Sequence, residues 1–305
     1  MKNKIIKLFN LLIYPLTFNI FFKKIISNDF IVLLYHDVSD KPSAFHRTEN
    51  LYVNKKKFKD QILFLKKYYK FINPKNIKSE NQPTALVTFD DGAYSYFKNA
   101  VPFLTKQKIP SIHFLNISPI INNFFSSAFA VYLVNKGYIK KKKFTDLKYN
   151  DFKFYLKDAS LCKKVKAFHG KFVTLKYLKK FKNNKYVYFG NHLYNHYNVI
   201  KLSKSEIKYY YEKNLKYLKK FKNSINFFSY PFGQKNENYN NFTDKYILNI
   251  LKCKKIFYAD TLSFNKDFAQ SIHRMTITND MDEVSFKKKV IFFKVRNFFL
   301  RFNSF

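Results

Sequence analysis

The sequence is poor in cysteine, arginine and acidic side chains, and each scarcity excludes a class of protein. Its two cysteines, Cys162 and Cys253, lie far apart and form no C-x-x-C pair. Disulfide-stapled domains and zinc ribbons need more cysteines at closer spacing, so neither is expected. The 305 residues contain no tryptophan, five glycines and eight prolines, and 47% are hydrophobic. With no repeat and no disordered-type tract, the composition predicts a globular protein with a sizeable core.

Acidic residues are scarce beside basic ones, with 20 Asp and Glu against 57 Lys and Arg and a net charge of +37. Only four of the basic residues are arginine, namely Arg47, Arg274, Arg296 and Arg301. Proteins that read bases favour arginine for its bidentate fork, so no specific nucleic-acid partner is predicted. The lysine excess has two open explanations: compositional drift in an AT-rich genome, or attraction to an anionic polymer or membrane surface.

Residues 1–29 have basic ends and an apolar middle that Pro15 and Asn19 interrupt. This stretch is too short and too broken to predict a transmembrane helix, and no small-residue cleavage site of a signal peptide follows it. Two interpretations stay open, a helix at a membrane interface and an ordinary packing helix. The location of the protein also stays open, with a membrane-associated or cell-envelope place favoured over the free cytoplasm.

From residue 30 onward, short β-rich runs alternate with amphipathic runs. Ser203 and Glu206, for example, form a capping box ahead of one such helix. This alternation predicts an α/β fold with parallel strands and crossover helices over residues 30–285. A lysine-rich helical insertion is expected at about residues 120–185, and a C-terminal helix at residues 286–305. The expected strands are 31–35, 84–89, 111–115, 186–189, 225–229, 255–259 and 272–277.

The stretch "ALVTFDDG", residues 85–92, runs from an apolar strand directly into two carboxylates, Asp90 and Asp91. An Asp-Gly pair is a hairpin signal, but the residues that follow have apolar side chains at helical spacing rather than in alternation. The segment is therefore expected to be a strand, an acidic turn and a helix. A buried pair of like charges is costly unless a cation or a shared proton compensates it.

Acids and histidines recur wherever an expected strand ends, which is where (β/α) barrels carry their chemistry. The first strand ends at His36, and a later one leads into "GNHLYNH" with His192 and His196. On a helical turn, the i, i+4 spacing of these two histidines would aim both rings at one cation. A carboxylate would complete a two-histidine, one-carboxylate set, with Asp90 and Asp91 as the available donors. One acid would bind the cation while its neighbour takes a proton from water.

The motifs "TFDDG", "GNHLYNH" and "FSYPFG", in this order and at these intervals, resemble the polysaccharide deacetylase family, the NodB homology domain of carbohydrate esterases. The early "LLYHDV" is similar to the lead-in of many bacterial members. The resemblance covers residues 30–280 approximately. It implies a distorted (β/α) barrel with fewer than eight repeats and the removal of acetyl groups from N-acetylated sugars. It also implies a divalent metal, usually Zn²⁺, with Co²⁺, Ni²⁺ or Fe²⁺ as alternatives.

The resemblance assigns roles to residues of the three motifs. It makes Asp90 the catalytic base and Asp91, His192 and His196 the metal ligands. It places Tyr230, with Pro231 and Phe232, along the substrate groove, and gives the Tyr230 N–H to the oxyanion. His36 is a further candidate for the groove, with packing at the end of its strand as the alternative. His113, inside an apolar strand, is expected to be a core histidine.

The sequence departs from the family pattern at several positions. Leu193 stands where members often have Ser or Thr, so a hydrogen bond that braces the histidine loop is expected to be missing. Ser229 stands where many members have an Arg that orients the base, and Arg274 is the candidate replacement. His273 lies in about the region of the family's late acid histidine, in surroundings that match poorly. A strand residue at the barrel rim is the alternative for His273.

The sequence thus predicts a metal-dependent hydrolase that removes acetyl groups from an acetamido-sugar glycan of a bacterial cell surface, or from its precursor. The alternative is a non-catalytic barrel module that binds anionic glycan, lipid or nucleic acid through its lysine surface. The adjacent acids and the histidines favour the enzyme, because a binding module has no need of a buried carboxylate pair.

Overall fold

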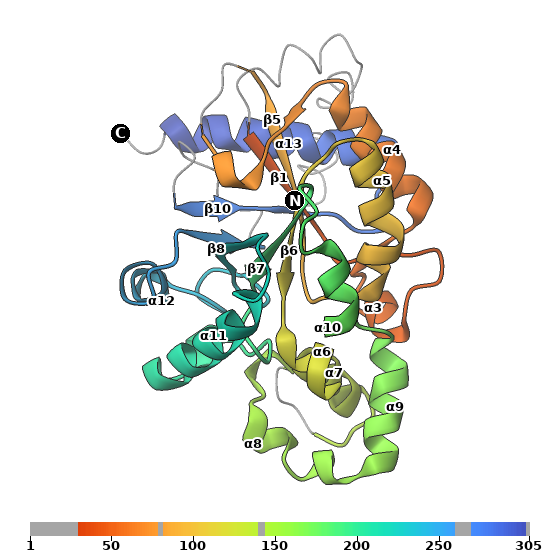
Figure 1. Ribbon diagram of the computed structural model, residues 1–305, viewed down its shortest axis with the longest axis vertical. Helices are drawn as coiled ribbons and strands as arrows, with labels where there is room; N and C mark the ends of the chain where they lie inside the picture. The colour runs from red at the N-terminus through yellow and green to blue at the C-terminus, as the bar shows by residue number, and fades with distance from the viewer. Residues whose placement is uncertain (1–29, 79–81, 140–143, 260–269, 303–305) are drawn as a thin grey trace, which may run out of the picture.

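A computed structural model describes residues 30–78, 82–139, 144–259 and 270–302 (Figure 1). The interpretation of residues 1–29 as a membrane-interface helix therefore lies outside the described residues. Among the residues that are described, no helix has the length and apolar character needed to cross a membrane.

The centre of the molecule is a parallel sheet that curls into a nearly closed barrel, with helices between successive strands (Figure 1). This confirms the predicted distorted (β/α) barrel. The strands follow the order β10, β9, β8, β7, β6, β5, β1, β11, and β4 pairs with β5 off this path. Their bounds are β1 Phe30–Tyr35, β4 Lys70–Phe71, β5 Thr84–Phe89, β6 Ser111–Leu115, β7 Val187–Asn191, β8 Ser224–Ser229, β9 Lys255–Tyr258, β10 Ser271–His273 and β11 Met275–Thr276. A separate pair consists of β2 Asp37–Val38 and β3 Tyr52–Val53.

The strands form where the sequence has short, continuous apolar runs. Every residue of β1, β5 and β6 is buried, as expected for parallel strands covered on both faces. The last predicted strand, residues 272–277, is in fact broken at Arg274. β10 pairs with β9 at one end of the sheet and β11 pairs with β1 at the other, so the chain crosses the seam of the barrel at this residue.

The helices cover the barrel with the apolar faces that the sequence predicts. In α4, Phe58, Ile62 and Leu65 are buried at helical spacing, and the side chain of Asn54 caps the first turn. The capping box of Ser203 and Glu206 is confirmed at the start of α11. Around the barrel lie α3 Ala44–Thr48, α4 Lys55–Lys66, α5 Val101–Lys106, α11 Lys204–Leu218, α12 Asn241–Lys245 and α13 Glu283–Phe302, with π-helical turns η3 Tyr96–Ala100 and η8 Tyr246–Ile250 and short 3₁₀ turns η2 Pro74–Asn76 and η7 Val199–Lys201.

The long connection from β6 to β7 is built of helical segments, which in Figure 1 extend below the barrel. We call it the insertion. It holds α6 Ile117–Asn122, α7 Ser126–Asn135, η4 Phe144–Asp146, α8 Tyr149–Phe152, η5 Tyr155–Lys157, α9 Ala159–His169, α10 Leu175–Leu178 and η6 Lys179–Phe181. Because it begins where β6 ends, it starts at the carboxyl end of the barrel strands.

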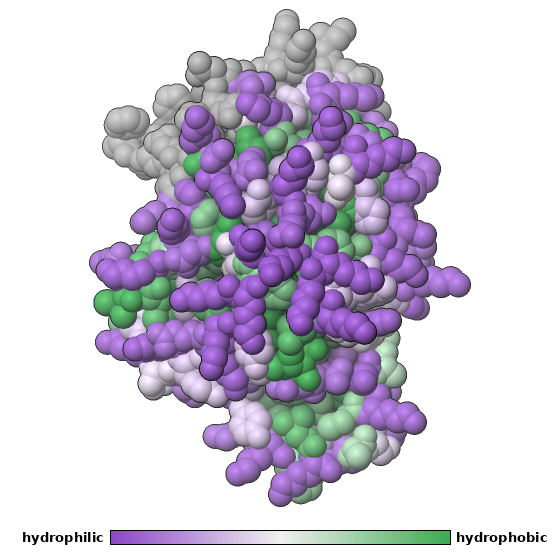
Figure 2. Space-filling view, in the orientation of Figure 1, coloured by the Kyte–Doolittle hydropathy of each residue, from purple (hydrophilic) through white to green (hydrophobic). Residues whose placement is uncertain are grey.

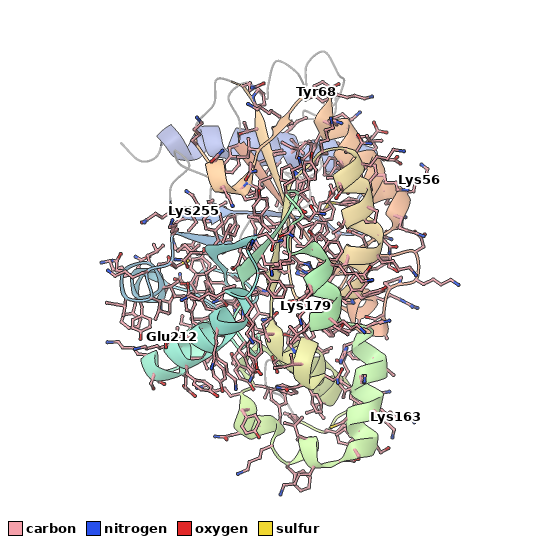
Figure 3. The ribbon with its side chains drawn as sticks, in the orientation of Figure 1. Lys56, Tyr68, Lys163, Lys179, Glu212 and Lys255 are labelled. Carbon is pink, nitrogen blue, oxygen red and sulfur yellow. The ribbon has the colours of Figure 1, made fainter. Side chains whose placement is uncertain are left out.

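Hydrophilic side chains cover most of the face shown in Figure 2. Lysines come from many elements, including Lys56 on α4, Lys163 on α9 and Lys179 on η6, which Figure 3 labels and which are all exposed. The positive charge is therefore spread over the surface rather than gathered on one element.

Candidate active site

A pocket of about 310 Å³ lies at the carboxyl ends of the strands. It contains most of the acids and histidines that the sequence places at strand ends, namely His36, Asp90, Asp91, His192 and His196. Its walls also carry aromatic rings, from Phe45, Phe125, Phe144, Tyr230 and Phe232. The pocket therefore combines a polar, titratable floor with apolar walls, which is the usual make-up of a small-molecule site.

The acidic turn after β5 gives Asp90 and Asp91 different sets of partners, although His192 Nε2 lies 3.6 Å from Asp90 Oδ2 and 3.5 Å from Asp91 Oδ1. Asp91 has a φ of 76° and Gly92 a φ of 97°, so the chain reverses within two residues. Only glycine adopts such a φ without strain, which explains Gly92. Below the turn, His113 Nε2 lies 2.9 Å from the Gly92 nitrogen and 3.0 Å from the Asp90 carbonyl oxygen. Burial lowers the pKa of His113 to about 4, so this histidine is a neutral core residue that supports the turn.

Asp90 is held by a two-pronged ion pair with Arg274, the residue at the barrel seam. Arg274 Nη1 donates to Asp90 Oδ1 at 2.7 Å and Nη2 donates to Oδ2 at 2.8 Å. The Nη2 group also donates to Ser229 Oγ at 2.7 Å, and Nε donates to the Tyr258 carbonyl at 3.1 Å. Arg274 is fully buried, so the pair is shielded from water. The structure thus brings Arg274 to both Asp90 and Ser229, as expected for a replacement of the arginine that Ser229 lacks.

Arg274 also sets the charge of Asp90. Burial alone would raise the pKa of Asp90, but the Arg274 guanidinium, together with His192 and His36, outweighs burial and holds this pKa below its usual range. A carboxylate paired in this way stays ionised near neutral pH, and a general base must be ionised to accept a proton.

Asp91, His192 and His196 form a buried cluster on the other side of the turn. One ligand atom from each residue lies within 4.8 Å of the others. His192 Nε2 is 3.5 Å from Asp91 Oδ1, and His196 Nε2 is 3.3 Å from the same oxygen. Both rings therefore aim the same nitrogen at one carboxylate oxygen.

The histidines do not lie on a helical turn, so this part of the prediction is wrong. They lie on an irregular loop that follows β7, in which Leu193 has a φ of 63° and His196 a φ of 54°. These left-handed residues turn the loop back on itself and bring both rings to Asp91. The two imidazole rings therefore converge on one point as expected, but on a loop rather than on a helix.

The donor set fits a divalent cation. Asp91 is 3% exposed, and its Oδ1 atom has no hydrogen-bond donor among the described residues. Burial lowers the pKa of His196 to about 3, so its ring is neutral, as a metal ligand must be. Burial opposes a charge on His192 too, but Asp90 and Asp91 outweigh it and raise the pKa of His192. A cation among these atoms would supply the partner that the Asp91 oxygen lacks.

The two other candidate histidines lie in different surroundings. His36, at the end of β1, lines the pocket, and burial lowers its pKa although Asp91 and Asp90 oppose this effect. His273, at the end of β10, does not line the pocket but stacks on the Tyr258 ring at 4.8 Å. The structure therefore brings His36, and not His273, to the acids.

The "SYPFG" segment contributes to the pocket in part. Tyr230 and Phe232 line it, while Pro231 is buried outside it. The expectation that the Tyr230 N–H serves an oxyanion is wrong, because this group donates to the Phe257 carbonyl at 3.1 Å as a continuation of the sheet. The Tyr230 hydroxyl donates to Asp244 at 2.8 Å. Phe232 has a φ of 63°, and its ring lies edge-on to His196 at 4.7 Å.

Sequence reasoning missed the part of the pocket that the insertion provides. Phe125, Ser127, Phe144 and Thr145 line it, and Ser127 Oγ lies 2.6 Å from His196 Nδ1. None of these residues is in a motif, and they are distant in sequence from the histidines. The available signal was the pair Ser126–Ser127 next to an aromatic pair, which is too common a pattern to indicate a site.

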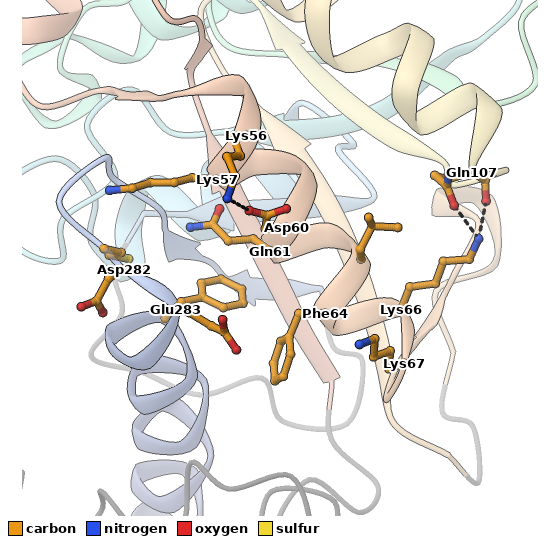
Figure 4. Close-up of a pocket in the computed structure, with 13 residues that line it drawn as sticks. Lys56, Lys57, Asp60, Gln61, Phe64, Lys66, Lys67, Gln107, Asp282 and Glu283 are labelled. Atoms are coloured by element: carbon orange, nitrogen blue, oxygen red, sulfur yellow. Dashed lines mark hydrogen bonds and ion pairs between the residues drawn. The ribbon is translucent and has the colours of Figure 1, made fainter.

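A second hollow, of about 830 Å³, lies between α4 and the start of α13 (Figure 4). Its charged groups bond with one another: Lys56 Nζ lies 3.1 Å from Asp60, and Lys66 Nζ donates to Gln107 Oε1 at 2.9 Å. No histidine lines it. This hollow is larger than the pocket at the strand ends, but the two buried acids of the turn and the two histidines near them line that pocket instead.

Comparisons with known proteins agree with this geometry. Residues 77–251, more than half of the chain, match the family described as polysaccharide deacetylase. Similar solved structures include the Streptococcus pyogenes deacetylase PplD in complex with acetate, at 18% identity over 85% of this chain and 96% of that one, with a TM-score of 0.57. IcaB from Ammonifex degensii is 18% identical over 88% of this chain and 97% of that one, with a TM-score of 0.58. No curated protein sequence matches the chain significantly.

Proposed function

Since the chain belongs to the polysaccharide deacetylase family, whose members are hydrolases of carbon–nitrogen bonds other than peptide bonds, we propose that it deacetylates N-acetylated sugars of a bacterial cell-surface polysaccharide or its precursor. The observation that carries the proposal is the pairing, in one pocket, of an ionised base held by Arg274 with a buried Asp91–His192–His196 cluster. One of the two similar structures named above, PplD, is a deacetylase in complex with acetate, which is the product of such a reaction.

We propose a divalent metal, Zn²⁺, as the cofactor, held by Asp91, His192 and His196. Nitrogen and carboxylate ligands suit zinc, with Co²⁺, Ni²⁺ or Fe²⁺ as alternatives. When bound, such a cation supplies a Lewis acid that polarises the acetyl carbonyl and acidifies water. A site with three protein ligands leaves positions for water and substrate.

The side chains of this protein would then carry the proton transfers. Asp90 accepts a proton from the water that attacks the acetyl carbon, and the Arg274 fork keeps its carboxylate oriented during this step. The new C–O bond forms as the carbonyl becomes an oxyanion. The Phe232 N–H is the candidate donor to that oxyanion, because Phe232 lines the pocket and its N–H has no acceptor within the described part of the chain.

Collapse of the oxyanion breaks the C–N bond, and the departing amine needs a proton. We assign this role to His36 in place of His273, because His36 lines the pocket beside both acids. The proton that Asp90 takes from water would pass through His36 to the amine, and the lowered pKa of His36 favours release of that proton once its ring has accepted it. The products are acetate and a free amino sugar.

The size and walls of the pocket suit one acetamido sugar. A volume of about 310 Å³ lies at the lower end of small-molecule sites. The Phe125 and Phe232 rings offer apolar contact to an acetyl methyl group or a sugar face. The rest of a polymer would extend over the lysine-covered surface, whose charge would also attract an anionic membrane or glycan without sequence- or site-specific contacts.

The experiment that tests the proposal joins metal analysis to acetate release on one purified preparation. N-acetylglucosamine oligomers, peptidoglycan fragments and lipid-linked acetamido sugars would be compared with an O-acetylated xylan. We expect acetate from at least one N-acetylated substrate, loss of activity with a chelator, and recovery on adding Zn²⁺. Metal-free protein with unchanged activity, or release from the O-acetylated substrate alone, would contradict the proposal.

A further inference from the structure

The histidine loop is held in an unfavourable conformation by its neighbours. Leu193 and His196 both have positive φ, a backbone conformation that is unfavourable for residues other than glycine. A loop with two such residues needs contacts from outside to stay in place. Leu193 also stands where the family often has a bracing hydroxyl, so the contacts must come from elsewhere.

Buried side chains from two other elements supply these contacts. Asn116, at the start of the insertion, donates to the carbonyl oxygens of His192 and Leu193. Ser126, the first residue of α7, donates to the carbonyl oxygens of Asn195 and His196. Both donors are at most 3% exposed, so water does not compete for these bonds. The hydrogen bond predicted to be missing at Leu193 is thus replaced from the insertion.

The two histidines differ in what holds their Nδ1 atoms. His192 Nδ1 lies 2.8 Å from the Ser229 carbonyl oxygen, which can only accept, so this nitrogen carries the hydrogen and Nε2 is left as the ligand. His196 Nδ1 lies 2.6 Å from the hydroxyl oxygen of Ser127, which is 4% exposed. The rings of Phe125, Phe232 and His192 lie at 5.4, 4.7 and 4.8 Å from this ring and confine it without bonding to Nδ1.

We propose that Ser127 of the insertion is a positioning residue that fixes the ring and tautomer of His196 for metal binding, and that the insertion is thereby part of the metal site. The proposal rests on the metal-dependent function proposed above. With Nε2 directed at Asp91, Nδ1 carries the hydrogen and donates it to Ser127 Oγ. Partners of this kind keep a metal-bound histidine oriented, and their loss typically weakens metal affinity 10- to 100-fold.

The test compares three variants of Ser127. Ser127→Thr and Ser127→Val have nearly equal volume and differ only in that a methyl group of valine replaces the hydroxyl of threonine, while Ser127→Ala removes the hydroxyl. The Zn²⁺ affinity of the full chain would be measured by competition with a chromogenic chelator. We expect Ser127→Ala and Ser127→Val to bind Zn²⁺ about 10- to 100-fold more weakly than wild type, and Ser127→Thr to stay within about 3-fold.

Ser111→Ala is the matched control, because Ser111 is another buried serine whose hydroxyl bonds to a side chain, the Tyr96 hydroxyl at 2.9 Å, at the opposite end of β6. It should keep wild-type Zn²⁺ affinity. Wild-type affinity in Ser127→Ala and Ser127→Val overturns the proposal, as does equal weakening in Ser127→Thr or Ser111→Ala. A wild-type chain that binds no Zn²⁺ overturns the metal-dependent function itself, and this is measured before any variant is compared.

Discussion

The two sides of the acidic turn are built in opposite ways. On the side of the proposed base, which we call the base side, Asp90, Ser229 and Arg274 come from strand ends or the barrel seam, and both carboxylate oxygens receive donors from one buried guanidinium. On the side of the proposed metal, which we call the metal side, Asp91, His192 and His196 come from the turn and an irregular loop, and the Asp91 Oδ1 atom receives no hydrogen bond from the described residues.

This difference shows which of the two carboxylate charges, that of Asp90 or that of Asp91, the protein neutralises with its own side chains. The charge of Asp90 is neutralised by Arg274 within the fold, so the base side is complete without a ligand. The buried Asp91 oxygen is left for a cation, because an unpaired buried charge is otherwise costly. Two adjacent acids of one turn therefore receive different roles from what surrounds them.

The largest expected effect is on the metal side. Asp91→Asn should weaken Zn²⁺ binding by more than about 10²-fold, because even the loss of a partner behind a ligand costs 10- to 100-fold. His192→Ala should do the same. Metal content by mass spectrometry, measured with acetate release on each preparation, checks the prediction. If Asp91→Asn keeps full metal and activity, the two sides of the turn do not differ as described.

Asp90→Asn should leave metal binding intact and lower turnover about 10²- to 10⁴-fold, the usual contribution of a positioned general base. The metal remains because Asp90 is outside the Asp91–His192–His196 cluster. The same paired measurement applies. Metal loss in Asp90→Asn with metal retained in Asp91→Asn would exchange the roles of the two acids.

The third expected effect separates His36 from His273. His36→Asn should lower turnover about 10²-fold as the source of the amine's proton, with metal content unchanged. His273→Asn is the control, since His273 stacks on Tyr258 outside the pocket. Steady-state acetate release from both variants decides between them, and a larger loss in His273→Asn would reverse the assignment.

The smallest expected effect is on the pH dependence of activity, which tests the pairing of Arg274 with Asp90. Arg274 contributes to the lowered pKa of Asp90, so removing its charge in Arg274→Gln should raise that pKa. The base works only when ionised, so activity is lost as the pH falls through this pKa, and the acid limb of the profile should move to higher pH. Arg274→Lys keeps the charge and should move the limb less. An unmoved limb in Arg274→Gln would show that Asp90 is not the titrating base.

The fold was predictable because its strands are short apolar runs of the kind that parallel sheets bury on both faces. The runs at residues 84–89 and 111–115 are the strands β5 and β6 without a change of boundary. The break at Arg274 was not predictable, because "IHRMTI" has the alternation of one strand. Only the closure of the barrel, which places β9 and β1 on either side of the seam, divides it in two.

The site was predictable where chemistry and position coincide, as at Asp90, Asp91, His192 and His196. It was not predictable where a role depends on hydrogen bonds made across the fold. The Tyr230 N–H is taken by Phe257 of a neighbouring strand, and Ser127 reaches His196 from 69 residues away. No local spacing indicates either contact.

Arg274 is made 184 residues after the acid that it binds. Until the seam forms, Asp90 lacks the buried guanidinium that binds both of its carboxylate oxygens. The pairing of β11 with β1 closes the seam that carries Arg274, so closure of the barrel also brings Arg274 to the proposed base Asp90. Contacts of such long sequence separation form late and slowly in folding. Acetate release would therefore serve as a reporter of full barrel closure, silent in any folding intermediate whose seam is still open.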